Sequence, residues 1–330
     1  MVTFPAGGRR GGTARDLPKK LGGHTTSAVQ VIGHAGLAIQ SEGGAPTRRH
    51  LEDALELGVD RIELDVCCTA DGQLVVRHDV SVADGRFVAD LELAELGRAG
   101  AAVLRLDEVV EHLGGRVPLL LDIKMGGAAE LLGPWLRRRR DPDTFAVCTE
   151  NLPWLLHLRF AAPRVARWPS FPDLGDRRSH HVQRVVVGLW RSHASLDGLR
   201  RGLVDVQRAA RHLRERPQES LANLAGMPWR GRLPMDVAQT RDDIAAAGMC
   251  VHHWVVSERL VEEAHSFGLH VNTWTVNNPF AARTVAAAGV DSITTDRVHL
   301  VRVALQSQDP PDPRLQAGRP VRAVVRIAPS

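Results

Sequence analysis

The amino-acid sequence predicts an α/β fold, a single (β/α)8 TIM-type barrel with a helical insertion in a late loop. Short β-branched runs alternate with helical patterns over residues 29–305, which is typical of a parallel sheet with crossover helices. The run PLLLDIK at residues 118–124 is apolar almost throughout, as in a strand that is covered on both faces. A region of this length fits one closed barrel better than an open sheet.

The predicted elements alternate along the chain. β-Branched and apolar runs predict strands at residues 28–34, 61–66, 74–78, 118–124, 145–149, 164–168, 269–276 and 291–296. Apolar residues at helical spacing predict helices at residues 50–58, 152–161, 257–268 and 278–290. Gly58 is expected to end the first of these helices. The run Arg137–Arg140 is expected at the end of another helix, because cations favour the negative end of the helix dipole.

Three segments depart from this alternation. Residues 1–28 are rich in glycine and basic residues and predict a disordered arm, and residues 306–330 predict a Pro-rich irregular tail. Residues 176–231 carry apolar positions at helical spacing with arginines on the other faces, which predicts the helical insertion. These arginines indicate a solvated basic face on packed helices. The alternative is contact with anionic lipid headgroups, which would make the insertion a peripheral membrane contact.

Composition narrows the class of protein. The formal charge of +4 permits an anionic substrate and gives no argument for nucleic acid as a partner. The four cysteines lack the spacing of a zinc site, so they are expected to be reduced packing residues. No apolar run has the length of a signal peptide or a membrane span, and a cytoplasmic protein is therefore expected.

Acidic residues interrupt two of the predicted strands. Glu63 and Asp65 are two residues apart, so they share one face of their strand, and buried carboxylates need a partner or a metal. Asp122 and Lys124 share a face at the carboxyl end of the run LLLDIK, which is the active-site end of a parallel barrel. The three acids offer hard oxygen ligands suited to Mg²⁺ or Ca²⁺. Lys124 would neutralise an anion bound to that metal.

Two histidines are expected at the same rim. Asp71-Gly72 predicts a two-residue hairpin turn between the strands at 61–66 and 74–78. With these two residues at the centre of the turn, Asp65 is expected to pair with His78. His34 ends the first strand in the sequence VIGHAG and is expected at the same end of the barrel.

Together these segments resemble a known enzyme family. The order GHxG, ELGVDRIELDVxxTxDGxLVVxHD, LLLDIK, VNTWTVN and GVDSITTD resembles the glycerophosphodiester phosphodiesterases over roughly residues 29–302. The resemblance implies metal-dependent hydrolysis of a small-molecule or lipid phosphodiester, here a glycerophosphodiester cleaved to glycerol phosphate and an alcohol. It also implies roles for seven residues: the acid/base pair His34 and His78, the metal ligands Glu63, Asp65 and Asp122, the phosphate-facing Lys124, and Trp274 in the substrate pocket.

The chain departs from the family pattern at three places. His34-Ala35-Gly36 stands where the family usually has HRG, and residues 44–47 read GAPT where it usually has PENT. Asp122 stands where glutamate is common. Two alternatives therefore remain: a sphingomyelinase D-like or lysophospholipase D-like lipid phosphodiesterase, and a degenerate non-catalytic barrel that binds a phosphodiester or lipid headgroup. Retention of both histidines beside the acids favours an enzyme.

Overall fold

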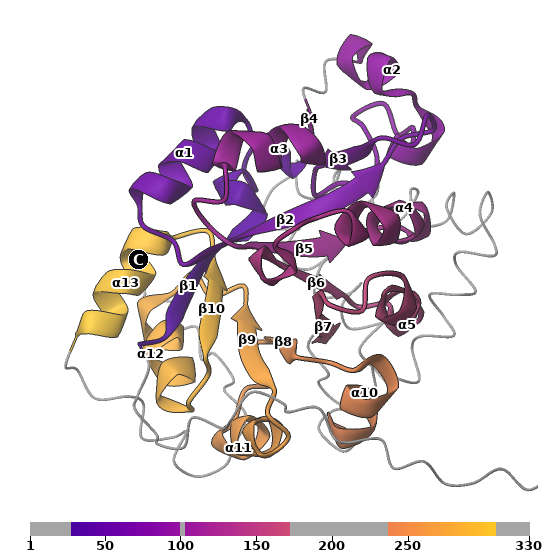
Figure 1. Cartoon of the computed structure of the whole chain (residues 1–330). Coiled ribbons are helices and arrows are strands. Elements are labelled where there is room, and N and C mark those ends of the chain that lie inside the picture. The colour runs from indigo at the N-terminus through magenta and orange to yellow at the C-terminus, as the bar shows by residue number, and fades with distance from the viewer. Residues whose placement is uncertain (1–27, 100–102, 172–236, 308–330) are drawn as a thin grey trace, which may run out of the picture.

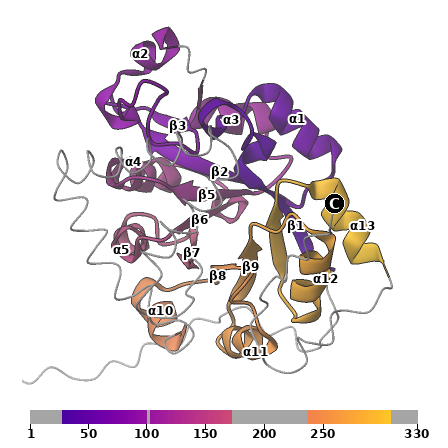
Figure 2. The same ribbon diagram turned by 180° about the vertical axis from the view of Figure 1, so that it is seen from behind.

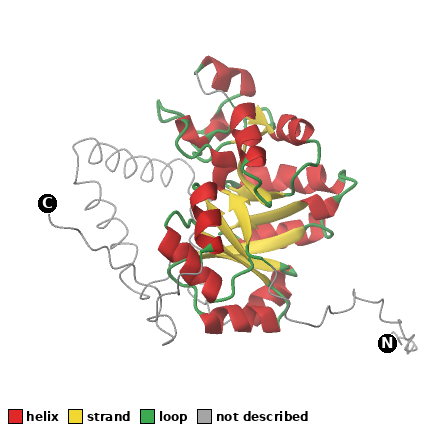
Figure 3. Ribbon diagram, turned by 90° about the vertical axis from the view of Figure 1, so that its left-hand side faces the viewer, coloured by secondary structure: helices red, strands yellow, loops and turns green. Residues whose placement is uncertain are grey.

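The computed structural model describes residues 28–99, 103–171 and 237–307. They form a closed barrel of parallel strands surrounded by helices (Figures 1–3). The predicted fold class is therefore confirmed. The predicted insertion (176–231) lies outside the described residues, as do the predicted arm (1–28) except for residue 28 and the predicted tail (306–330) except for residues 306 and 307. Gln306 is the last residue of a helix, so the helix extends one residue into the predicted tail.

Eight parallel strands make the barrel wall. They are β1 (Gln30–Gly33), β2 (Arg61–Cys68), β5 (Leu119–Ile123), β6 (Phe145–Thr149), β7 (Ala166–Phe171), β8 (Gly248–His252), β9 (His270–Trp274) and β10 (Ser292–Thr295). Strand β1 pairs with both β2 and β10, which closes the barrel. The sequence patterns did not predict β8, because Val251 is its only β-branched residue.

Helices cover the outside of the wall (Figure 3). They are α1 (Arg48–Glu56), α3 (Leu106–Leu113), α4 (Gly126–Arg137), α5 (Leu152–Ala161), α10 (Val237–Ile244), α11 (Glu258–Ser266), α12 (Pro279–Ala287) and α13 (Val298–Gln306). Gly58 has φ +67° just beyond α1, and Arg137 is the last residue of α4, as predicted for both. Within the described ranges, no helix combines the length and apolar character needed to cross a membrane.

A smaller excursion leaves the barrel between β2 and β5, at the top of Figure 1. It contains β3 (Leu74–Val76), β4 (Leu104–Arg105) and α2 (Leu93–Arg98). Short 3-10 turns complete the described elements: η1 (His34–Leu37), η2 (Glu42–Gly44), η3 (Val88–Asp90) and η4 (Pro142–Thr144).

The predicted register of the β2–β3 hairpin was wrong by one residue. Val66 pairs with Val76, and the amide of Arg77 donates to the carbonyl of Asp65, so Asp65 lies opposite Arg77 and not opposite His78. The loop has three residues rather than two: the amide of Thr69 donates to the carbonyl of Gln73, and Gly72 has φ +76°. A left-handed residue at the end of a three-residue loop inserts a bulge and shifts the pairing.

The two faces of the strands line two cores. Outward side chains such as Leu64, Leu121 and Val271 pack beneath the helices. The inside of the barrel has a separate apolar cluster of Ile32, Leu120, Ala146, Cys148, Trp168 and Cys250. All four cysteines are free and buried, as predicted. Side chains alternate between the two faces of a strand, so Glu63 and Asp65, which flank the outward-facing Leu64, both point into the barrel.

A half-buried histidine lies at the amino end of the barrel, at the start of β9. His270 stacks on Trp168 with ring centroids 4.6 Å apart, and its Nε2 lies 2.7 Å from Oγ of Ser292. Burial lowers the pKa of His270 to about 4 from an ordinary 6.5. The folded protein therefore keeps this ring neutral at pH values where the unfolded chain would protonate it.

We expect His270 to make the protein acid-sensitive. Its pKa is lower in the folded than in the unfolded state, so stability falls as the pH drops below 6.5 and the loss is complete near pH 4, with a total of about 3 kcal/mol. His270→Gln should be less stable at pH 7.5 but lose less stability between pH 7.5 and 4.5, measured by urea unfolding. The exposed His157→Gln is the control; an unchanged pH dependence in His270→Gln would contradict the assignment.

Candidate active site

A cavity of about 570 Å³ opens at the carboxyl end of the barrel. Its lining includes six of the seven residues predicted from the sequence: His34, Glu63, His78, Asp122, Lys124 and Trp274. The seventh, Asp65, is 1% exposed and lies in the floor beside Asp122. The fold thus brings all seven residues together, although the strands that carry them are far apart in sequence.

Three carboxylates form the floor of the cavity. Glu63 and Asp65 project from β2, and the parallel register places Asp65 beside Asp122 on β5. One oxygen from each of the three lies within 4.8 Å of the others. Burial raises the pKa of Glu63 to about 8, and the neighbouring Asp65 adds to that effect. Burial also raises the pKa of Asp122, and Lys124 opposes that rise.

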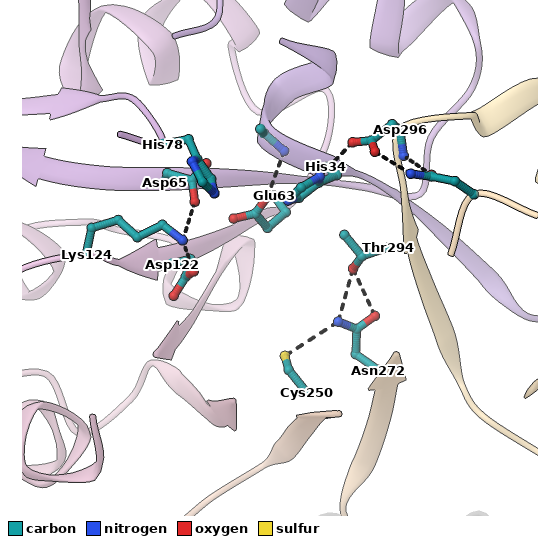
Figure 4. Close-up of polar contacts among 12 residues, drawn as sticks. His34, Glu63, Asp65, His78, Asp122, Lys124, Cys250, Asn272, Thr294 and Asp296 are labelled. Atoms are coloured by element: carbon teal, nitrogen blue, oxygen red, sulfur yellow. Dashed lines mark hydrogen bonds and ion pairs between the residues drawn. The ribbon is translucent and has the colours of Figure 1, made fainter. Parts of the chain in front are cut away.

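Lys124 lies against two of these acids (Figure 4). Its Nζ is 2.7 Å from Oδ1 of Asp65 and 2.6 Å from Oδ2 of Asp122. Burial alone would lower the pKa of Lys124, but the two carboxylates raise it well above its ordinary value. The residue is therefore an ammonium ion that offsets part of the negative charge of the floor.

The floor has the donor set of a divalent-cation site. Two buried carboxylates and the half-buried Asp122 face a single ammonium group, so negative charge is in excess. Among the described residues, neither oxygen of Asp65 accepts a hydrogen bond of good geometry, although the group is fully buried. Oδ1 of Asp65 contacts Lys124 as an ion pair, and carboxylate oxygens that accept no hydrogen bond are available to Mg²⁺ or Ca²⁺. The residues therefore fit such an ion.

Asp296 holds His34 from behind (Figure 4). Nδ1 of His34 lies 2.6 Å from Oδ1 of Asp296, so this nitrogen carries the proton, and Nε2 lies 4.0 Å from Oε2 of Glu63. Asn277 fixes the carboxylate, because its side chain donates to Asp296 and accepts from the Asp296 amide. Burial alone would lower the pKa of His34, but the hydrogen bond to Asp296 and the charge of Glu63 raise it to about 9.

Sequence patterns did not identify the role of Asp296, although the segment DSITTD contains it. The contact between Asp296 and His34 could have been predicted from closure of the barrel, which pairs the first strand with the last. Gly33 pairs with Thr295, so the next residue on each strand, His34 and Asp296, must also be neighbours.

His78 occupies a more open place. Its ring centroid is 6.4 Å from that of His34, and its Nδ1 lies 3.1 Å from Oδ1 of Asp79. The side chain of His78 is 40% exposed, against 17% for His34. The two rings therefore border the same cavity in different environments, one buried and one near solvent. His78 lies two residues beyond the end of β3 at Val76.

Ala35 stands where the resembled family has an arginine, and it contacts the site through its backbone amide. Its amide donates to Oε2 of Glu63 over 2.7 Å, and its side chain is buried. Ala35 and Gly36 adopt φ +48° and +58°, so the turn after β1 aims this amide at the acid. Within the described part of the chain, no arginine lines the cavity.

Aromatic and polar residues form the wall of the cavity. Trp274 comes from the end of β9, and Asn151 and Trp154 come from the start of α5. The two latter residues were not anticipated, because their segment shows only a helical apolar pattern. Their position follows from the rule that loops after barrel strands gather at the carboxyl end.

Comparison with known proteins agrees with this geometry. A sequence model of the "Glycerophosphoryl diester phosphodiesterase family" matches residues 46–162 and 215–300, more than half of the chain. The glycerophosphodiester phosphodiesterase of Caldanaerobacter subterraneus subsp. tengcongensis is 27% identical over 252 residues, covering 74% of this chain and 84% of that protein.

Solved structures share the fold at lower identity. An Oleispira antarctica phosphodiesterase, in complex with the product sn-glycerol-3-phosphate, gives a TM-score of 0.59 at 17% identity, covering 84% of this chain and 97% of that chain. The glycerophosphodiester phosphodiesterase of Thermotoga maritima gives a TM-score of 0.55 at 19% identity, covering 83% and 97%.

Replacing Asp296 should change the protonation of His34. In the metal-free protein, Asp296→Asn should lower the pKa of His34 by roughly 1–3 units, because a charged hydrogen-bond partner is lost. The measurement is the pH titration of histidine ring signals by NMR, with the His34 signal identified by its absence in His34→Gln. Asp84→Asn is the control, because Asp84 is an exposed carboxylate that pairs with Arg86 and is not among the groups that shift the pKa of His34. A His34 titration that is the same in Asp296→Asn as in the wild type would contradict this account.

Proposed function

The chain belongs to the glycerophosphoryl diester phosphodiesterase family, a family of phosphoric diester hydrolases, and we propose that it hydrolyses a glycerophosphodiester to glycerol phosphate and an alcohol. One observation carries the proposal: His34 and His78 border a single cavity whose floor holds three clustered acids and a lysine. The product bound to the Oleispira protein, sn-glycerol-3-phosphate, supports a small-molecule substrate of this kind.

Charge neutralisation is the first requirement of this reaction. A phosphodiester is an anion and would be repelled by the acids of the floor. In the proposal Glu63, Asp65 and Asp122 hold a divalent cation, Mg²⁺ or Ca²⁺, which when bound supplies positive charge to the phosphate oxygens. Lys124 borders the cavity and adds an ammonium group beside the same position.

Proton transfer is the second requirement. One imidazole accepts a proton from the nucleophile, and the other donates a proton to the leaving alkoxide. The carboxylate of Asp296 stabilises the imidazolium form of His34 and fixes its ring, as a carboxylate does for histidine in other hydrolases. The side chain of His78 is more exposed than that of His34 and borders the same cavity.

Turnover of defined diesters tests the proposal. We expect the wild-type chain to release glycerol phosphate from at least one of glycerophosphocholine, glycerophosphoethanolamine and glycerophosphoinositol, and EDTA to abolish the activity. His34→Ala and His78→Ala should each lower kcat by about 10²–10⁴-fold, the usual contribution of a general acid or base. Cleavage confined to lysophospholipids would indicate a lipid phosphodiesterase instead. Binding of these compounds without turnover, in the presence of Mg²⁺ or Ca²⁺, would indicate a barrel that binds phosphodiesters without cleaving them.

Metal affinity tests the floor separately from turnover. Glu63→Gln, Asp65→Asn and Asp122→Asn should each weaken binding of Mg²⁺ or Ca²⁺ by about tenfold or more, because each removes a charged oxygen ligand. The measurement is titration calorimetry on chelator-treated protein, with the exposed Asp84→Asn as the control. Unchanged affinity in all three variants would show that the acids do not hold the ion.

A further inference from the structure

Arg77 is a buried arginine next to His78 in sequence. Its side chain and backbone together are 2% exposed, which places it among the largest fully buried residues. Burying a guanidinium is unfavourable unless its donors find acceptors, and an apolar side chain of similar length avoids that penalty. An arginine at such a place therefore indicates a need for directed hydrogen bonds.

Those hydrogen bonds span His78. Nε of Arg77 donates to the carbonyl of Asp79 over 2.7 Å, and Nη2 donates to the carbonyl of Ser81 over 2.9 Å. The amide of Arg77 donates to the carbonyl of Asp65 in β2 over 2.9 Å. The backbone on both sides of His78 is thus connected to the strand that carries Glu63 and Asp65.

Two glycines of η2 form the other side of this arrangement. A Cβ added to Gly43 would lie 2.0 Å from Nη2 of Arg77, and a Cβ added to Gly44 would lie 2.5 Å from Cβ of His78. The carbonyl of Gly43 also accepts from the amide of Asp79 over 3.0 Å. The guanidinium and the β-carbon of His78 therefore pack directly on the glycine backbone.

We propose that Arg77 is a positioning residue that fixes His78 over the cavity floor. The planar guanidinium presents donors in fixed directions, so it can hold the carbonyls of Asp79 and Ser81 at once while lying on Gly43. Arg77 does not line the cavity and acts only through His78. The inference rests on the proposed catalytic role of His78.

The chain contains a matched control for this residue. Arg167 is 6% exposed, and its guanidinium likewise donates to backbone carbonyls, those of Ile244, Val165 and Ala245. It lies near the start of β7, at the end of the barrel opposite the cavity. Arg77→Met and Arg167→Met should therefore lose comparable stability, but only the first should disturb His78.

Steady-state kinetics separate positioning from stability. Arg77→Met should lower kcat on the best glycerophosphodiester by about 100-fold, the effect of a misplaced catalytic group, and leave KM within about twofold. Arg77→Lys should recover part of kcat, because an ammonium group can still reach one carbonyl. Arg167→Met should keep kcat within about twofold. A normal kcat in Arg77→Met, a loss confined to KM, or an equal loss of kcat in Arg167→Met would each overturn the proposal.

Glycine variants test the same contact without removing the arginine. Gly43→Ala should lower kcat because its methyl group collides with the guanidinium. Gly58→Ala shares the left-handed backbone, with φ +67° against +62°, but its Cβ would have no atom within 4 Å. It should leave kcat unchanged, and equal losses in the two variants would count against the contact. If Arg77→Met does not fold, this pair and Arg77→Lys decide the question.

An NMR measurement keeps the inference separate from the proposed function. The ring signals of His78, identified by their absence in His78→Gln, should shift or broaden in Arg77→Met and stay unchanged in Arg167→Met. Absence of diester turnover in the wild type would refute the proposed function, while these signals would still test the positioning. Unchanged His78 signals in Arg77→Met would overturn the inference whatever the activity.

Discussion

Repulsion among three clustered carboxylates, two of them buried, is the constraint on which the rest of the site depends. Glu63, Asp65 and Asp122 lie within 4.8 Å of one another, and burial raises the pKa of Glu63 to about 8. Each neighbouring group offsets part of that charge. Lys124 lies between two of the acids, and the left-handed turn at Ala35 directs an amide at the third. Lys124 and the Ala35 amide therefore reduce the unfavourable energy of placing the acids together.

The closed barrel supplies the geometry that a linear sequence cannot. His34 and Asp296 are 262 residues apart, yet they are adjacent because β1 completes the wall against β10. The acids come from neighbouring strands, so their spacing is set by the ladder between β2 and β5. His78 is different, because it lies beyond the end of β3. Its position depends on loop packing rather than on the barrel ladder.

Sequence patterns predicted the features that depend on short-range periodicity. Alternation of strands and helices gave the barrel, and a period of two placed Glu63 and Asp65 inside it. The prediction of the hairpin register was wrong because Asp71-Gly72 is compatible both with a two-residue turn and with the end of a three-residue loop. The contact of Asp296 with His34 depends on closure of the whole barrel. No sequence pattern indicates that Arg77 is buried, because a single arginine after a strand is usually exposed to solvent.

The charge balance of the floor links the fold to the proposed reaction. A metal would bind the acids in their ionised form. With Glu63, Asp65, Asp122 and Asp296 all ionised, Lys124 and protonated His34 leave an excess of two negative charges. A monoanionic diester would be repelled from such a site. A divalent cation held by Glu63, Asp65 and Asp122 would offset that excess, and the ammonium group of Lys124 would then attract the diester. In the proposed function the metal would therefore assist substrate entry as well as the chemical step.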